Sequence, residues 1–115
     1  MSRKSSASAA RLADAAPVFS ALGDETRLRI VARLCDQGPL SIARLSVGNN
    51  VTRQAITKHL HALADAGLVR DRRSGRECIW ELEPRRIEQA RRYLDSISAH
   101  WDDAISRLQA LVEDD

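Results

Sequence analysis

The hydrophobic residues in the first third of the chain recur at helical spacing between cap residues. A short helix is predicted over about residues 15–21, with Pro17 in its first turn, where its missing N–H is not needed. A second helix is predicted from the N-cap Asp24 to about residue 36, before Gly38-Pro39. Its buried face is expected to carry Leu28, Val31, Ala32 and Cys35, with Ile30 and Leu34 widening it.

Two further N-cap residues predict the next pair of helices. Leu40 is expected to be briefly extended, and Ser41 to cap a short helix that turns Ile42 and Leu45 inward. Gly48-Asn49-Asn50 is typical of a turn. Thr52 then caps a helix to about residue 66, whose buried stripe at i, i+4 and i+7 is Ile56, Leu60 and Leu63.

The hydrophobic period changes to two at Leu68. Residues 68–72 and 77–82 are predicted to form two strands, joined by residues 73–76 as a hairpin. Cys78, Trp80 and Leu82 would share one face of the second strand. Pro84 ends this strand and begins a final helix to about residue 112.

The final helix carries one apolar stripe whose members alternate spacings of three and four, as in a coiled-coil heptad. The stripe consists of Ile87, Ala90, Leu94, Ile97, Trp101, Ala104, Leu108 and Leu111. The rest of the domain is too small to cover the whole stripe. We therefore expect a partner helix, most simply from a second copy of the chain. The alternative is that the stripe packs across the first two helices of its own chain.

The order of these elements defines an architecture. A short helix, a tight turn and a second helix, followed by a basic hairpin, are typical of a winged helix-turn-helix. The predicted fold is therefore mainly α with a small β-hairpin, dimeric through its terminal helices. Residues 1–14 are expected to form a flexible arm, and residues 15–115 one domain with its dimerisation helix at 84–112.

Composition narrows the classes of protein to consider. The 115 residues suffice for one domain, and only 3% are aromatic, so Leu, Ile, Val and Ala must build the core. No signal peptide or membrane-length apolar run is visible, so we expect a cytoplasmic protein. Cys35 and Cys78 are expected to be reduced, Cys35 in the core and Cys78 in the hairpin sheet.

Charge is concentrated in the middle of the chain. The net charge is only +2, but residues 53–76 hold six Lys and Arg against two Asp. On the fourth predicted helix, polar side chains face away from the buried stripe, at about 100° per residue. These are Gln54, Thr57, Lys58 and His61, with Arg53 at the helix start. The hairpin adds Arg72, Arg73 and Arg76.

These residue types favour binding of double-stranded DNA over a merely solvated surface. Arg53 suits guanine, Gln54 suits adenine, and Thr57 can meet a thymine methyl. Lys58 and His61 suit phosphates, and arginines at a hairpin tip suit a narrow minor groove. His59 lies at the margin of the buried stripe, so we expect it to pack and to form a local hydrogen bond.

The chain resembles the ArsR/SmtB family of bacterial repressors over roughly residues 15 to 112. Four stretches carry the resemblance: FSALGDETRLRIVARL (19–34), GPLSIARL (38–45), TRQAITKHLHALADAGLV (52–69) and GRECIWELEP (75–84). Gly48-Asn49-Asn50 departs from the family, which continues the third helix there. The resemblance implies a homodimer that binds an inverted-repeat operator and represses its own operon, with an inducer that the sequence does not reveal.

The resemblance also bears on metals. Where the family's third-helix site has Cys-x-Cys, this chain has Ser41 and Ala43, so thiolate ligands are missing there. In the last-helix site, Asp95 is followed by Ser96 and Ile97 rather than by the expected His, leaving His100 and Asp103 as half a site. The chain is therefore similar to the metal-independent branch, with no metal or cofactor expected.

Enzymatic activity is not expected, because the chain has no phosphate-binding Gly loop, no H-E-x-x-H and no nucleophile elbow. Two other functions stay open. One is a repressor that senses a metal or a thiol oxidant, and the other is a winged-helix module that binds proteins rather than DNA. Salt-dependent DNA binding separates the latter from a regulator.

Overall fold

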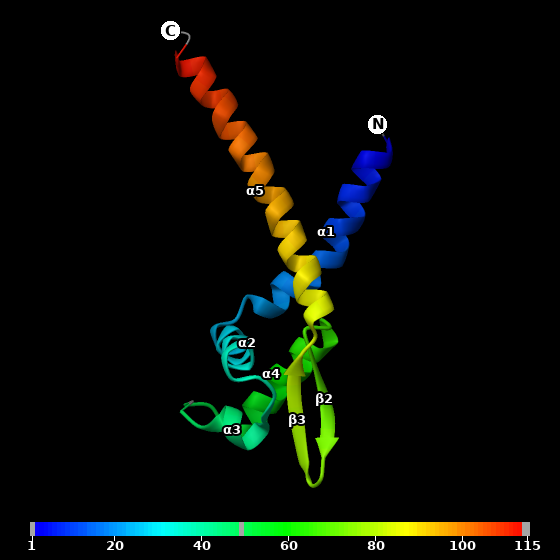
Figure 1. Ribbon diagram of the computed structural model, residues 1–115, viewed down its shortest axis with the longest axis vertical. Helices are drawn as coiled ribbons and strands as arrows, with labels where there is room; N and C mark the ends of the chain where they lie inside the picture. Colours follow the sequence, from blue (N-terminus) through cyan, green and yellow to red (C-terminus); the bar gives the residue numbers. More distant parts are fainter. Residues whose placement is uncertain (1, 49, 114–115) are drawn as a thin grey trace.

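The capped helices and the hairpin that the hydrophobic pattern predicts are present in the computed structural model, which describes residues 2–48 and 50–113, with side chains from residue 12 onward. In this part of the chain a mainly helical body carries a small sheet, whose hairpin of β2 and β3 projects from it (Figure 1). The helices are α1 (Ser2–Leu22), α2 (Glu25–Gln37), α3 (Ile42–Ser46), α4 (Arg53–Asp65) and α5 (Pro84–Glu113). The strands are β1 (Leu40–Ser41), β2 (Val69–Ser74) and β3 (Glu77–Leu82).

The sheet is antiparallel, in the order β1-β3-β2. The predicted hairpin is confirmed, although β2 continues through Arg73 and Ser74, which were expected in the loop. Leu40 and Ser41 pair with Trp80 and Ile79, so the segment before α3 forms the third strand. This pairing fixes the base of the hairpin against the helix-turn-helix.

The core forms where α2, α3, α4 and β3 meet, and Val18 and Ala21 of α1 and Ala90 of α5 complete it. The predicted stripe of α4 is confirmed, since Ile56, Leu60 and Leu63 are fully buried. The predicted inner face of α2 is wrong in part. Ile30 and Leu34 are buried, Val31 is partly buried, and Leu28 is 50% exposed. Ala32 and Cys35 are also exposed, because the α2 stripe that meets the core is centred on Ile30 and Leu34.

The start of α1 differs from the prediction. The helix begins at Ser2, so residues 2–14 are helical rather than an arm preceding a short helix, and Pro17 lies inside the helix. The segment before Pro17 contains no glycine and several alanines, the residue with the highest helix propensity. Met1 lies outside the described residues, as do Asn49 of the predicted turn and residues 114–115.

The terminal helices α1 and α5 cross above the core and then diverge, so the start of α1 and the end of α5 lie far from the hairpin (Figure 1). At the crossing, the rings of Phe19 and Tyr93 lie 6.0 Å apart. Arg86 of α5 donates to the Ala66 carbonyl beyond α4 at 3.1 Å, and it forms an ion pair with Asp14 of α1 at 3.0 Å. The terminal helices are thereby tied to the end of α4.

Within the described residues, no helix combines the length and the hydrophobicity that crossing a lipid bilayer requires.

Candidate DNA-binding interface

The helix-turn-helix is built from α3 and α4, each begun by the predicted cap. Ser41 Oγ accepts a hydrogen bond from the N–H of Arg44 at 3.3 Å, and Thr52 Oγ1 accepts one from the N–H of Ala55 at 3.1 Å. Both caps satisfy amides that a helix start leaves without intrahelical partners. Asp24 precedes α2 as predicted, but its side chain forms no cap hydrogen bond there.

Arg33 of α2 supports the end of α3. Its guanidinium donates to the carbonyls of Leu45 and Val47, both at 3.1 Å. The last carbonyls of a helix have no intrahelical partner, so a cation here stabilises the turn that leads into α4. Sequence reasoning missed this contact, because Arg33 and Val47 meet only when α2 and α3 pack together.

The outer face of α4 carries the predicted polar residues. Arg53, Gln54, Lys58 and His61 are exposed, whereas Thr57 is half-buried. The Thr57 hydroxyl donates to the Arg53 carbonyl at 2.8 Å, which satisfies this donor inside the helix. Among the residues with described side chains, neither Arg53 nor Lys58 forms an ion pair, so both cations are available to an anionic partner.

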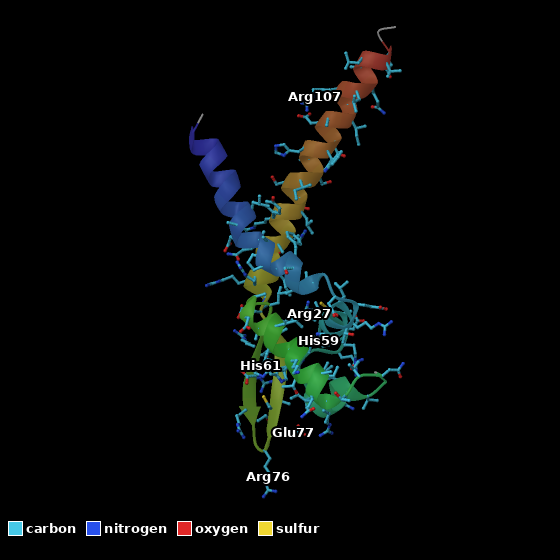
Figure 2. All side chains as sticks on the ribbon, turned by 180° about the vertical axis from the view of Figure 1, so that it is seen from behind. Arg27, His59, His61, Arg76, Glu77 and Arg107 are labelled. Atoms are coloured by element: carbon cyan, nitrogen blue, oxygen red, sulfur yellow. The ribbon has the colours of Figure 1, made fainter. Side chains whose placement is uncertain are left out.

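The arginines of the hairpin fall into two groups. Arg72 lies on the face with Arg70, and its Nε is 3.5 Å from Glu81, so its charge is already compensated. Arg73 points to the other face, opposite Cys78, and Arg76 lies at the end of the hairpin, directed away from the body (Figure 2). Across the described side chains, no ion pair includes Arg73 or Arg76.

His61 connects α4 to the hairpin. Its ring meets the Trp80 ring edge-on, with 5.9 Å between centroids. Trp80 is buried, and its Nε1 has no hydrogen-bond partner among the described residues. His61 therefore has a structural contact besides the phosphate contact predicted for it. This contact cannot be predicted from the sequence, since residues 61 and 80 belong to separate elements.

His59 packs as expected, on the opposite side from His61. Its Nδ1 lies 4.0 Å from the Asp24 carboxylate, and both side chains are mostly buried. This distance fits an ion pair when the imidazole is protonated, but it is too long for the predicted hydrogen bond.

The two cysteines occupy different environments. Cys35 is exposed, so its predicted place in the core is wrong; it lies on the face of α2 that turns away from Ile30 and Leu34. Cys78 is half-buried in the hairpin as predicted, with Sγ 3.6 Å from the Asp71 carboxylate. Burial and this neighbouring carboxylate raise the pKa of the Cys78 thiol. A protonated thiol is a poor nucleophile and a poor metal ligand.

The positions relevant to metal binding serve other purposes. Ser41 caps α3, and Ala43 has no ligand atom. His100 Nδ1 is hydrogen-bonded to the Ser96 carbonyl at 2.9 Å, and Asp103 lies 3.6 Å from Arg107. Within the described residues, no group of three His, Cys, Asp or Glu side chains could hold a metal ion.

The predicted dimer stripe divides into two parts. Ala90 is buried and Ile87 half-buried against the chain's own core, so these two residues lie in an intrachain contact. The following residues are turned to solvent: Leu94, Ile97, Trp101, Leu108 and Leu111 are exposed, and Ala104 is half-buried. The alternative of packing within the chain therefore applies only to the start of the stripe. Ile105 and Val112 widen the exposed face.

Comparison with known proteins supports this reading of the fold. Residues 22–72, which contain α2, α3, α4 and the start of β2, match a helix-turn-helix domain family. The arsenical resistance operon repressor of Escherichia coli is 32% identical over 95 residues, covering 83% of this chain and 79% of that protein.

Two solved structures extend the likeness beyond the matched domain. An ArsR-like transcriptional regulator from Rhodococcus superposes with a TM-score of 0.72 and 36% identity, covering 86% of this chain and 92% of that one. A homodimeric winged helix-turn-helix DNA-binding domain from Mycobacterium bovis, a possible ArsR-family regulator, gives 0.62 and 28%, covering 80% and 83%. The similarity thus includes most of the chain.

Proposed function

The chain belongs to the ArsR family of winged helix-turn-helix transcriptional regulators, and from this premise we propose that it is a homodimeric repressor that binds an inverted-repeat operator in its own promoter. Members of this family are DNA-binding regulators rather than enzymes, and we propose no catalytic activity for this chain. The observation that carries the proposal is the set of exposed cations on α4 and at the hairpin tip that form no ion pair with any described side chain.

The proposed roles divide the site into base-reading and phosphate-binding residues. Arg53 and Gln54 lie in the first turn of α4, the part of a recognition helix that enters the major groove. Thr57 is next along this face and offers its methyl group, since its hydroxyl is engaged within the helix. Lys58 and His61 are assigned to phosphates, and Arg73 and Arg76 to the adjacent backbone or minor groove, with Arg72 able to join them after leaving Glu81.

The dimer is proposed to form through the exposed part of the α5 stripe, from Leu94 to Leu111. The Mycobacterium bovis neighbour is a homodimer, and the E. coli relative is a repressor. An exposed apolar face of this length is unusual in a monomer, and the same face of α5 in a second copy can bury it. A twofold dimer also explains why an inverted repeat is expected, because operator symmetry mirrors the symmetry of the protein.

Two substitutions separate base reading from phosphate binding. Gln54→Ala is expected to lose about 1–3 kcal/mol of binding free energy on the operator and to relax specificity at one base pair per half-site. Arg73→Ala should weaken binding to all sequences alike and reduce the salt slope by about one per protomer. Binding isotherms on operator and scrambled DNA measure both effects. Arg91→Ala, an exposed α5 variant that also removes one positive charge, is the control. If Gln54→Ala and Arg73→Ala both bind every probe like the unmodified protein, the face is wrongly assigned.

A further inference from the structure

The outer face of the hairpin carries a charge cluster centred on Glu81 of β3. Arg70, directly opposite on β2, places Nε 3.1 Å from Glu81 Oε1 and NH1 2.8 Å from Glu83 Oε2. Arg72, two residues nearer the tip, places Nε 3.5 Å from Glu81 Oε2. One carboxylate thus engages two arginines, one through each oxygen. Its side chain is only 22% exposed, so it stays close to the sheet.

The arginines of the hairpin differ in whether they are free to bind phosphate. Arg73 and Arg76, nearest the tip, form no ion pair with any described side chain, whereas Arg72 pairs with Glu81, which lies farther from the tip. Glu81 engages Nε of Arg72, so a DNA phosphate can use every donor of this guanidinium only after Glu81 releases it. The Arg72 side chain is 51% exposed, and exposed ion pairs are weak, so the release is readily reversible.

We propose that Glu81 competes with DNA phosphates for Arg72 and so limits the affinity of the hairpin for the DNA backbone. The inference rests on the proposed DNA-binding function and extends it to a residue outside the contact surface. Phosphate contacts contribute equally on every sequence, because they carry no base information. While Glu81 holds Arg72, the affinity for DNA of any sequence is lower. The occupancy of a DNA site then depends more on the bases that α4 contacts.

The substitution Glu81→Gln tests the proposal, since it keeps the size of the side chain and removes its charge. We expect binding about two- to fivefold tighter per protomer on both operator and scrambled DNA, because an exposed ion pair contributes a factor of this size. The dependence of affinity on salt should steepen by about one unit of slope per protomer, because one more phosphate is neutralised. Fluorescence anisotropy titrations at several salt concentrations measure both quantities.

Two matched variants separate release of Arg72 from the loss of a negative charge. Glu83→Gln removes the same charge from the same strand end but frees only one contact of Arg70, so its effect should be less than half as large. In an Arg72→Ala background, Glu81→Gln should leave the salt slope unchanged. Thermal melting of each variant establishes that the hairpin stays folded.

Three results would overturn the inference. Equal effects of Glu81→Gln and Glu83→Gln would show that the tighter binding comes only from the change in net charge. A steeper salt dependence when Glu81→Gln is added to Arg72→Ala would show that a residue other than Arg72 is released. Unchanged affinity in a folded Glu81→Gln protein would show that the ion pair does not compete with DNA. Failure of the unmodified protein to bind DNA would instead overturn the proposed function itself, together with this inference.

Discussion

Replacing Trp101 with aspartate is expected to produce a folded monomer whose operator affinity is lower by about 100-fold or more. Trp101 lies in the middle of the exposed α5 stripe, and its side chain is 65% exposed in a single chain. In the proposed dimer this indole is buried, and an aspartate there would lose its hydration without gaining a partner. The core residues Ile56 and Leu60 lie in another part of the molecule, so the fold should survive.

The loss of affinity follows from the number of half-sites that one molecule can reach. In a dimer the second recognition helix binds at a high effective concentration, and a monomer loses this gain. Light-scattering mass and a DNA titration on the same sample measure both effects. Ser106→Asp, which adds the same charge on the opposite side of α5, should remain dimeric and bind normally. A Trp101→Asp protein that stays dimeric and keeps its operator affinity would place the interface elsewhere, most simply on α1.

The affinity of the protein for DNA is expected to fall steeply as the salt concentration rises. Each protomer offers Arg53, Lys58, Arg73 and Arg76 without ion-pair partners among the described side chains. A dimer that neutralises about six to eight phosphates should lose about 10³- to 10⁴-fold in affinity between about 50 and 200 mM salt. The slope of log K against log salt, measured by anisotropy, gives the number of phosphates directly. A slope near zero would favour the open alternative of a protein-binding module.

The features predicted correctly from sequence are those set by local chemistry. Ser41 and Thr52 cap their helices because a short side-chain oxygen next to a helix start satisfies a free amide in any fold. The α4 stripe was also predictable, since Ile56, Leu60 and Leu63 are its only large aliphatic residues. The polar face of α4 then follows from helical geometry alone, and with it the location of the candidate site.

The features that sequence missed depend on tertiary contacts. On α2 the apolar residues form two overlapping stripes, and the sequence does not show which stripe is buried. Packing against the core buries Ile30 and Leu34 and leaves Leu28 and Cys35 exposed. The pairing of Arg72 with Glu81 depends on the strand register, which places Arg70 opposite Glu81. The contact between His61 and Trp80 likewise needs the hairpin to fold back beside α4.

We propose that two copies of this chain place two α4 helices in successive major grooves of one operator. Capture of genomic fragments by the purified protein, followed by footprinting of the selected DNA, tests this most directly. We expect an inverted repeat upstream of the protein's own gene, protected as two half-sites about 34–36 Å apart, or about one helical turn. Selection of no specific sequence, or protection of an isolated half-site without symmetry, would contradict it.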